Sequence, residues 1–223
     1  MDDQSGREGV RDTYDRIAEH FSQTREYPWP EVETFLDGAP TDRLALDVGC
    51  GNGRHSELLA GHADRVIGLD VSRGLLAQAR ERIRDADVRS AVTLLQGDAS
   101  ALPLSTDSVT VAVYVATLHH LPDRQLRVAS LDELARVLSP DGRALVSAWS
   151  TAHDRFDAEA GFDTTVDWTL PGGETVPRYY HIYDPEEFEA DLAESGLEVL
   201  DASVSSGNCY AEVTAPAKGN IHK

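Results

Sequence analysis

A glycine-rich loop followed by two acidic residues is the part of this sequence best suited to bind a ligand. Residues 46–53 read Leu-Asp-Val-Gly-Cys-Gly-Asn-Gly and lie at the end of an apolar run that is typical of a buried strand. Glycines let the backbone turn sharply and approach a ligand that a Cβ atom would keep away. Asp70 ends the next apolar run, where its carboxylate can accept hydrogen bonds from ribose hydroxyl groups. Asp98 follows a third run and can accept one from an adenine amino group, so these features predict a site for one adenosine-containing cofactor.

The spacing of the glycines separates two classes of cofactor. A dinucleotide site needs G-x-G-x-x-G at the start of a helix that holds a pyrophosphate. This chain has G-x-G-x-G, with Arg54, His55 and Ser56 where the third glycine would come. Together with residues 97–99, Gly-Asp-Ala, the loop resembles that of the class I S-adenosylmethionine-dependent methyltransferases, and the resemblance spans most of the chain. A nucleotide-free α/β domain with an incidental glycine turn is the alternative.

The elements expected around the loop are those of an α/β protein. Apolar runs and helical periodicities alternate from Leu44 onward, which predicts a doubly wound, seven-stranded, mostly parallel sheet with an antiparallel final strand. The predicted strands are 44–48, 64–70, 92–96, 109–117, 143–149, 197–204 and 210–214. The predicted helices are 8–22, 31–36, 54–60, 72–85, 123–138 and 185–195, and a turn at 139–142 is expected to end the fifth of them. Ligands bind such sheets beyond the carboxyl ends of the strands, where the loop and both acidic residues fall.

The length of 223 residues fits a single methyltransferase domain, 1–223. Within it we expect an N-terminal helical segment at 8–37 and a substrate lid at 150–183, because so long an excursion in a compact domain is typically functional. The N-terminus is acidic and polar, and no apolar stretch approaches the ~20 residues that cross a bilayer, so a soluble, cytoplasmic protein is expected. Cys50 and Cys209 form neither a disulfide framework nor a metal-ligand spacing, so no metal is expected.

The charge is strongly negative and its composition is unusual. The formal net charge is −19, and among 20 basic residues only Lys218 and Lys223 are lysines. Such compositions resemble proteins from organisms with molar salt in the cytoplasm, where a Debye length of ~3 Å screens self-repulsion. We interpret the acidity as a halophilic adaptation to the solvent. The sequence has no strongly basic patch, so Arg54, Arg155 and Arg178 are the expected source of a local positive surface for RNA.

Four further segments resemble one methyltransferase family. They are residues 20–30 (His-Phe-Ser-Gln-Thr-Arg-Glu-Tyr-Pro-Trp-Pro), 118–120 (Leu-His-His), 176–183 (Val-Pro-Arg-Tyr-Tyr-His-Ile-Tyr) and 207–210 (Gly-Asn-Cys-Tyr). These segments are similar to those of the tRNA wobble-uridine carboxymethyl methyltransferases, which esterify 5-carboxymethyluridine in the anticodon loop. The resemblance implies S-adenosyl-L-methionine as cofactor and the tRNA anticodon loop as substrate. The cofactor-binding residues implied are Tyr14, Asp47, Gly49, Gly51, Asn52, Gly53, Asp70, Asp98, Ala99 and Val115.

The chemistry of carboxylate methylation suggests which residues hold the substrate. A carboxylate is already a nucleophile at neutral pH, so it needs alignment with the methyl donor and shielding from water rather than a general base. Arginine can donate two parallel hydrogen bonds to a carboxylate, and tryptophan offers a face on which an extruded base can stack. We assign these two roles to Arg25 and Trp29. The residues assigned to positioning the base or the second carboxylate oxygen are His119, His120, Tyr180 and His181.

These assignments have alternatives that the sequence leaves open. Arg25 can instead bind the carboxylate of the cofactor or cap the preceding helix. Trp29 lies between two prolines and can simply pack on the core. In an extended lid, residues 178–183 alternate between two faces, and the sequence does not say which face lines the site.

Residues 91–96, Ala-Val-Thr-Leu-Leu-Gln, are expected at one edge of the sheet in the family's topology. The run from 91 to 95 has no lysine, proline or charge, so it is open to pairing with another chain in a heterodimer. The resemblance implies that the partner chain is a small zinc-binding activator that also serves other methyltransferases of the translation apparatus. A loop of the same chain that covers the edge is the alternative.

Two other functions stay open at this point. A small-molecule methyltransferase of the quinone or sterol type would share residues 46–99 but should lack the segments at 20–30 and 178–183. A catalytically silent partner protein that binds the cofactor would share every feature except turnover.

Overall fold

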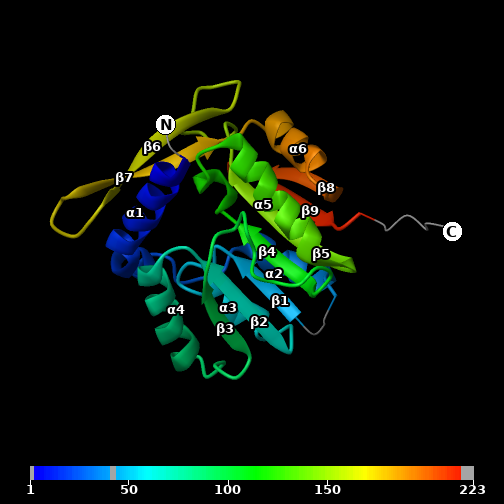
Figure 1. Ribbon diagram of the computed structural model, residues 1–223. Coiled ribbons are helices and arrows are strands. Elements are labelled where there is room, and N and C mark those ends of the chain that lie inside the picture. The colour runs from blue at the N-terminus through cyan, green and yellow to red at the C-terminus, as the bar shows by residue number, and fades with distance from the viewer. Residues whose placement is uncertain (1–2, 41–43, 217–223) are drawn as a thin grey trace.

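A seven-stranded sheet forms the centre of the computed structural model, which describes residues 3–40 and 44–216 (Figure 1). The strands lie in the order β3 (Val92–Gln96), β2 (Arg65–Asp70), β1 (Leu44–Val48), β4 (Val109–Val115), β5 (Leu138–Trp149), β9 (Asn208–Thr214) and β8 (Glu198–Ser205). Neighbouring strands are parallel except for the pairs β5–β9 and β8–β9, so β9 is the antiparallel strand. The predicted doubly wound, mostly parallel α/β fold is confirmed.

Helices pack on both faces of this sheet (Figure 1). The helices α5 (Arg124–Val137) and α6 (Pro185–Glu194) supply leucines and a phenylalanine to the larger core cluster on one face. On the other face, α2 (Pro30–Gly38) and α3 (Arg54–Leu59) pack against β1, β2 and β4. The helix α4 (Arg73–Asp85) lies beside β2 and β3 and contacts α1 (Asp3–Gln23). No helix in the described ranges combines the length and apolar character that crossing a membrane requires.

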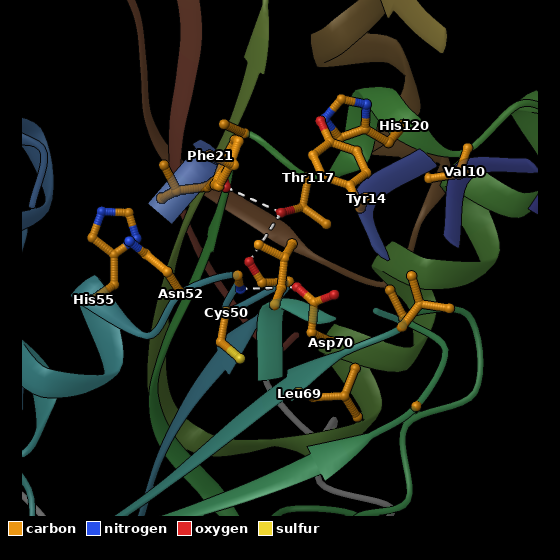
Figure 2. Close-up of a pocket in the computed structure, with 18 of the residues that line it drawn as sticks. Val10, Tyr14, Phe21, Cys50, Asn52, His55, Leu69, Asp70, Thr117 and His120 are labelled. Atoms are coloured by element: carbon orange, nitrogen blue, oxygen red, sulfur yellow. Dashed lines mark hydrogen bonds between the residues drawn. The ribbon is translucent and has the colours of Figure 1, made fainter. Parts of the chain in front are cut away.

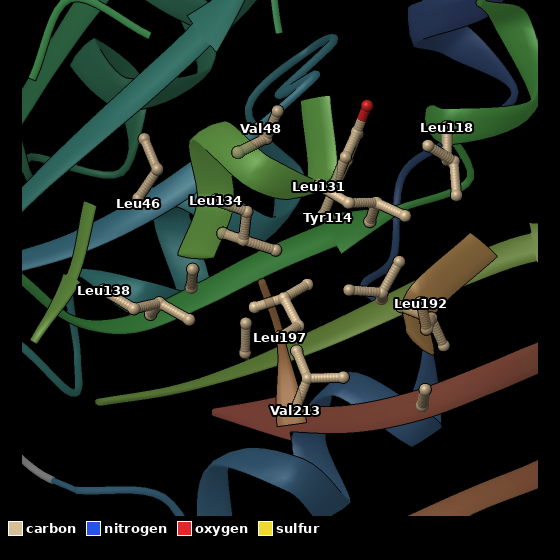
Figure 3. Packing of buried hydrophobic residues seen from close by; sticks show 14 of the residues in the cluster. Leu46, Val48, Tyr114, Leu118, Leu131, Leu134, Leu138, Leu192, Leu197 and Val213 are labelled. Carbon is tan, nitrogen blue, oxygen red and sulfur yellow. The ribbon is translucent and has the colours of Figure 1, made fainter. Parts of the chain in front are cut away.

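The central strand β4 is buried on both faces because its sequence is almost entirely apolar. Val111 and Val113 point toward α2 and α3, while Ala112 and Tyr114 point toward α5. Figure 3 shows Tyr114 among the leucines of α5 and α6. Its hydroxyl group lies 3.0 Å from the Ser130 hydroxyl, so the one polar atom that this ring brings into the core has a partner.

The structure corrects two predicted boundaries. Residues 139–142 read as a turn, yet β5 already begins at Leu138, which pairs with Val109 before the strand bulges and resumes at Arg143 opposite Val111. A bulge accommodates the Pro and Gly that made this segment look like a turn. The predicted strand 109–117 ends at Val115, because Ala116 has a left-handed φ of 53° and the short helix η1 (Leu118–His120) follows.

The segment expected as a lid contains a separate two-stranded hairpin. Its strands β6 (Phe162–Thr169) and β7 (Thr175–Ile182) are antiparallel, and they lie beside α1, away from the main sheet (Figure 1). Trp168 and Val176 pack against Ile17 of α1, which attaches the hairpin to the N-terminal helix. The α1 helix therefore lies between the hairpin and α4, above the carboxyl ends of the first strands.

Candidate active site

The glycine-rich loop after β1 has a backbone conformation that side chains rarely adopt. Gly49 has a φ of +71°, and a Cβ atom there would lie 2.2 Å from the Thr117 hydroxyl oxygen. Gly51 has a φ of +54°, and its amide donates a 2.8 Å hydrogen bond to Asp70 Oδ2. Glycine is therefore required at both positions, and the loop lies directly against the end of β2.

Asp70 connects this loop to the start of α4. Its second oxygen, Oδ1, accepts a 2.8 Å hydrogen bond from the amide of Ser72, the residue that caps α4. Burial raises the pKa of Asp70 to about 6, although the hydrogen bonds from Ser72 and Gly51 oppose the shift. The carboxylate is thus held in one orientation at the carboxyl end of β2, where each oxygen keeps a lone pair that can accept a hydrogen bond.

A cavity opens above these residues (Figure 2). Asp70, Cys50 and Leu69 lie on one side of it, and Tyr14 and His120 lie on the other. The predicted cofactor residues that line the cavity are Tyr14, Gly49, Gly51, Asn52, Asp70, Asp98, Ala99 and Val115.

The residues around this cavity fit an adenosine-containing cofactor. Asp70 faces it with oriented oxygens, and Asp98 and the apolar side chains of Leu69 and Leu75 also line it. Asp98 Oδ1 accepts hydrogen bonds of 2.8 and 2.7 Å from the amide and hydroxyl groups of Ser100, so this carboxylate is also oriented. Carboxylates for ribose and adenine beside apolar surface for a purine ring match the chemistry of S-adenosyl-L-methionine.

Two of the predicted cofactor residues do not line the cavity. Asp47 lies beneath the loop, where its Oδ2 accepts a 2.6 Å hydrogen bond from the Ser56 hydroxyl, and burial raises its pKa to about 7. Gly53 is the residue before α3 and packs against Ala79 of α4. A direct contact of either residue with the cofactor stays a prediction.

The side of the cavity opposite Asp70 is formed by a hydrogen-bonded pair. Tyr14 Oη lies 2.8 Å from His120 Nε2, and His120 Nδ1 lies 2.9 Å from the Tyr179 carbonyl oxygen. A carbonyl oxygen only accepts, so His120 donates from Nδ1, and its Nε2 accepts the proton of the Tyr14 hydroxyl. Burial lowers the pKa of His120 to about 4, which leaves the ring neutral at pH 7.

His119 is a neutral, buried neighbour of this pair. Its Nδ1 accepts a 2.9 Å hydrogen bond from the Trp149 amide, and its ring lies edge-to-face with that of His120 at 4.4 Å. Burial and the adjacent His120 hold the pKa of His119 well below its ordinary value. Neither histidine is therefore protonated at neutral pH, and both are fixed by backbone groups.

The hairpin presents two different faces, which resolves the alternation of residues 178–183. Arg178 donates a 2.5 Å hydrogen bond from Nη1 to Tyr180 Oη, and the Tyr180 ring contacts those of His119 and His120. His181 lies on the other face. Its ring nitrogens are 2.7 Å from Asp163 Oδ1 and 2.9 Å from Glu187 Oε1. Since both nitrogens of His181 already face carboxylates, the geometry favours a structural role for it over the predicted positioning role.

Arg25 and Trp29 do not line the cavity, but each contacts residues that do: Arg25 contacts Phe21, and the Trp29 amide donates to His55 Nε2. The guanidinium group of Arg25 lies over the rings of Phe21 and Trp168, 5.6 and 5.4 Å from their centroids. Its carbonyl oxygen accepts a 2.8 Å hydrogen bond from Asn52 of the glycine loop. Trp29 is half-buried beside the core cluster that includes Tyr210. Trp29 therefore packs on the core, and its role in stacking a base stays a prediction.

Four arginines near the mouth share an arrangement. Each lies over a tryptophan ring, and none of them forms an ion pair within the described part of the chain. We call this set the arginine rim: Arg25 and Arg178 on Trp168, Arg155 on Trp149, and Arg54 on Trp29. Burial and the charges of Arg25 and Arg82 lower the pKa of Arg54 to about 10, so it stays charged at pH 7.

The sequence predicted Arg178 as part of a positive surface for RNA, and it did not reveal that this side chain is buried. Arg178 is 8% exposed, and its Nε has no hydrogen-bond partner among the described residues. Its position two residues before Tyr180 in an extended segment was the one available signal. That spacing puts the two side chains on the same face, but it does not reveal that this face is buried against α1.

Comparison with known proteins supports the same class. A methyltransferase domain model matches residues 45–142. A putative methyltransferase of Encephalitozoon cuniculi is 32% identical, over 95% of this chain and 98% of that protein. The tRNA (carboxymethyluridine(34)-5-O)-methyltransferase of Saccharomyces cerevisiae is 34% identical over 77% of this chain and 60% of its own length. The mouse enzyme of that name, ALKBH8, is 38% identical over 63% of this chain, which spans only 20% of the mouse protein.

Solved structures share the fold at lower identity. A Haloferax volcanii putative methyltransferase in complex with the Trm112 methyltransferase activator has a TM-score of 0.68 at 18% identity, covering 95% of this chain and 99% of that one. A complex of DhpI with SAH has a TM-score of 0.69 at 20% identity, covering 95% and 98% of the two chains.

The fold and the loop beside Asp70 define a class I methyltransferase that uses S-adenosyl-L-methionine. The chain belongs to the methyltransferase family that contains the Encephalitozoon cuniculi protein and the tRNA (carboxymethyluridine(34)-5-O)-methyltransferases.

Proposed function

We propose that this protein methylates the carboxylate of 5-carboxymethyluridine at the wobble position of tRNA. The arginine rim is the observation that carries the proposal, because none of its four arginines has an acidic partner among the described residues, and Arg54 lines the cofactor cavity. Arg25 and Arg178 lie over the same Trp168 ring, and Arg155 lies over Trp149, whose ring centroid is 5.2 Å from that of Tyr180. The names of the relatives supply the substrate class.

The reaction suits a site without a general base. When bound, S-adenosyl-L-methionine supplies a methyl group on a positively charged sulfur. The substrate's carboxylate oxygen bonds to the methyl carbon as the carbon–sulfur bond breaks, and the bonding pair stays on sulfur, so no proton moves. This balance agrees with His119 and His120, which are neutral and whose hydrogen bonds hold them in place. Their role, together with Tyr14 and Tyr180, is to orient the substrate and to exclude water. Opposite charges attract more strongly in a site without water.

The tryptophans of the rim support an RNA substrate. A flipped base can stack on an exposed tryptophan face, and arginines pair with phosphate as well as with carboxylate. This chain has three tryptophans, and each lies against an arginine of the rim. Arg25, Arg54 and Arg155, with Trp29 and Trp149, are the members of the rim that reach solvent, and they give a local positive and aromatic surface on a chain with a net charge of −19. Arg178 and Trp168 are buried.

We also propose an activator at the β3 edge of the sheet. The topology places β3 at the end of the strand order, as expected for residues 91–96. Its backbone can therefore pair with a strand from a small zinc-binding activator protein, and the Haloferax volcanii methyltransferase complex with Trm112 supports a partner of that kind. We propose in addition that the acidic composition is a halophilic adaptation and that the protein acts on tRNA in the cytoplasm.

Methyl transfer to bulk tRNA tests the function directly. Methyl-labelled S-adenosyl-L-methionine is incubated with the protein and with tRNA from a strain that lacks this chain. Label in the anticodon loop that alkali releases as an ester supports the proposal. In a parallel incubation, a lipid extract of that strain replaces the tRNA, and label in the lipid would show a small-molecule methyltransferase instead. Absence of label in both fractions, in the presence and absence of the activator, would show a catalytically silent protein.

A further inference from the structure

We propose that Arg178, rather than Arg25, binds the carboxylate of the substrate and makes the site selective for an acid. The inference rests on the proposed function and deepens it. It arises from a comparison of the arginines in the structure, because one of them is deeply buried and has no acidic partner among the residues that the structure describes.

Burial without a counter-charge is the first argument. A buried cation costs free energy unless an anion or hydrogen bonds compensate it. Arg178 is 8% exposed, has no ion pair in the described ranges, and leaves its Nε without a hydrogen-bond partner. Arg127 also has an Nε without a hydrogen-bond partner among the described residues, and it differs from Arg178 in having carboxylates nearby. It is 3% exposed, but Glu187 and Asp191 lie 3.6 and 3.8 Å from its nitrogens. The substrate's carboxylate would supply Arg178 with the partner that the chain itself gives to Arg127.

The orientation of the guanidinium group is the second argument. It lies between two rings, 4.7 Å from the Trp168 centroid and 5.1 Å from that of Tyr180. Tyr180 also accepts the hydrogen bond from Nη1. These contacts hold the planar group in one position before a substrate arrives, and a planar fork of N–H donors can then bind a carboxylate at two points.

The third argument is position. Arg178 donates its hydrogen bond to Tyr180, whose ring centroid lies 4.5 Å from that of His120, and both His120 and Tyr14 line the cofactor cavity. A carboxylate bound to Arg178 would thus lie next to the cavity that holds the methyl donor. Arg25 lies over Phe21 and Trp168 but is more exposed than Arg178, so a phosphate of the RNA backbone can reach it from solvent.

This assignment also explains how product leaves. Methylation turns the anionic carboxylate into a neutral ester, so the product loses its ion pair with Arg178. An acid should therefore bind more tightly than the ester or the corresponding amide. A charge-assisted pair of this kind corresponds to about a ten- to hundredfold difference in affinity.

The test compares two anticodon stem–loop RNAs that differ only in carrying 5-carboxymethyluridine or 5-carbamoylmethyluridine. Their affinities for the full chain are measured by fluorescence anisotropy with S-adenosylhomocysteine present. Wild type is expected to prefer the acid about ten- to hundredfold, and Arg178→Met to bind both RNAs with similar affinity. Arg25→Met is expected to weaken both RNAs equally and to leave cofactor binding intact.

Arg127→Met is the matched control, because it also removes a buried arginine that lies over a tyrosine ring. It should lower the melting temperature and keep the preference for the acid, whereas Arg178→Met should keep the melting temperature. If Arg178→Met does not fold, Arg178→Lys replaces it and should reduce the preference without abolishing it. An unchanged preference in the folded Arg178 variant would overturn the inference. A separate assay with labelled S-adenosyl-L-methionine tests the proposed function, which a wild type that transfers no label to the 5-carboxymethyluridine RNA would overturn.

Discussion

At the scale of single residues, two buried carboxylates do different work at the end of the sheet. Asp70 lines the cavity and is held by two backbone amides, whereas Asp47 lies beneath the loop and is bonded to Ser56. Both carboxyl groups have pKa values raised by burial. The difference in position predicts that substitution of Asp70 affects the cofactor, and that substitution of Asp47 mainly affects the fold.

Asp70→Ala is expected to abolish measurable binding of S-adenosyl-L-methionine. The ribose hydroxyls would lose their acceptor, and the amides of Gly51 and Ser72 would lose theirs. Isothermal titration calorimetry measures the affinity, and Asp201→Ala, an exposed position on β8, is the control. Wild-type affinity in a folded Asp70→Ala protein would remove this residue from the site.

Asp47→Asn is expected to stabilise the protein increasingly as the pH rises. The pKa of Asp47 is raised from 3.8 to about 7, so the folded protein binds a proton that the unfolded chain releases. Stability therefore falls as the pH rises from about 4 to about 7. Asparagine keeps an acceptor for Ser56 without ionising. The variant should be more stable by about 1–4 kcal/mol at about pH 8 and by less at about pH 5, as urea unfolding can measure. An equal difference at both pH values would contradict the prediction.

At the scale of elements, the β6–β7 hairpin carries the proposed contacts with the substrate, and the edge strand β3 carries the proposed contact with the activator. The hairpin brings Arg178 and Tyr180 to α1 and η1. On its opposite face, Asp163 pairs with His181 in the register, and a hydrogen bond joins their side chains. The β3 strand is open along one side. Ala91 and Gly97 direct backbone hydrogen bonds to β2, so by alternation the amide of Leu94 points outward.

Leu94→Pro is expected to prevent binding of the activator without breaking the sheet. Proline removes one outward N–H group, which edge strands tolerate and which strand addition needs. Leu94→Val keeps the amide and an apolar side chain, so it is the matched control. Co-expression followed by gel filtration should give a complex with wild type and Leu94→Val and a monomer with Leu94→Pro. A stable complex with all three would rule out pairing along β3.

At the scale of the whole molecule, the charge of −19 sets the dependence on salt. From about 0.1 M to about 1 M potassium chloride, the Debye length falls from ~10 Å to ~3 Å and repulsion between carboxylates is screened. The melting temperature is expected to rise by about 2–4 °C for each kcal/mol by which this screening raises the free energy of unfolding. Calorimetry measures it, with sucrose of equal osmolality as control. A melting temperature that is flat or falls with salt would contradict a halophilic adaptation.

The sequence predicted the sheet better than the site because the two depend on contacts of different range. The strands and the cap of α4 at Ser72 follow from local periodicity and turn chemistry, and they appear close to their expected bounds. The face of β7 that meets the cavity depends on α1 and on Asp163 across the hairpin. No local spacing reports those contacts, so the sequence left open which face of residues 178–183 lines the site, and the burial of Arg178 was missed.

The most direct test of the central claim is methyl transfer to two anticodon stem–loops that differ only at the wobble base. One carries 5-carboxymethyluridine and the other carries unmodified uridine, and both are incubated with labelled S-adenosyl-L-methionine, the protein and its activator. The account predicts label only in the carboxymethyl RNA, released by mild alkali as methanol. Label in the unmodified RNA, or label that resists alkali, would contradict it.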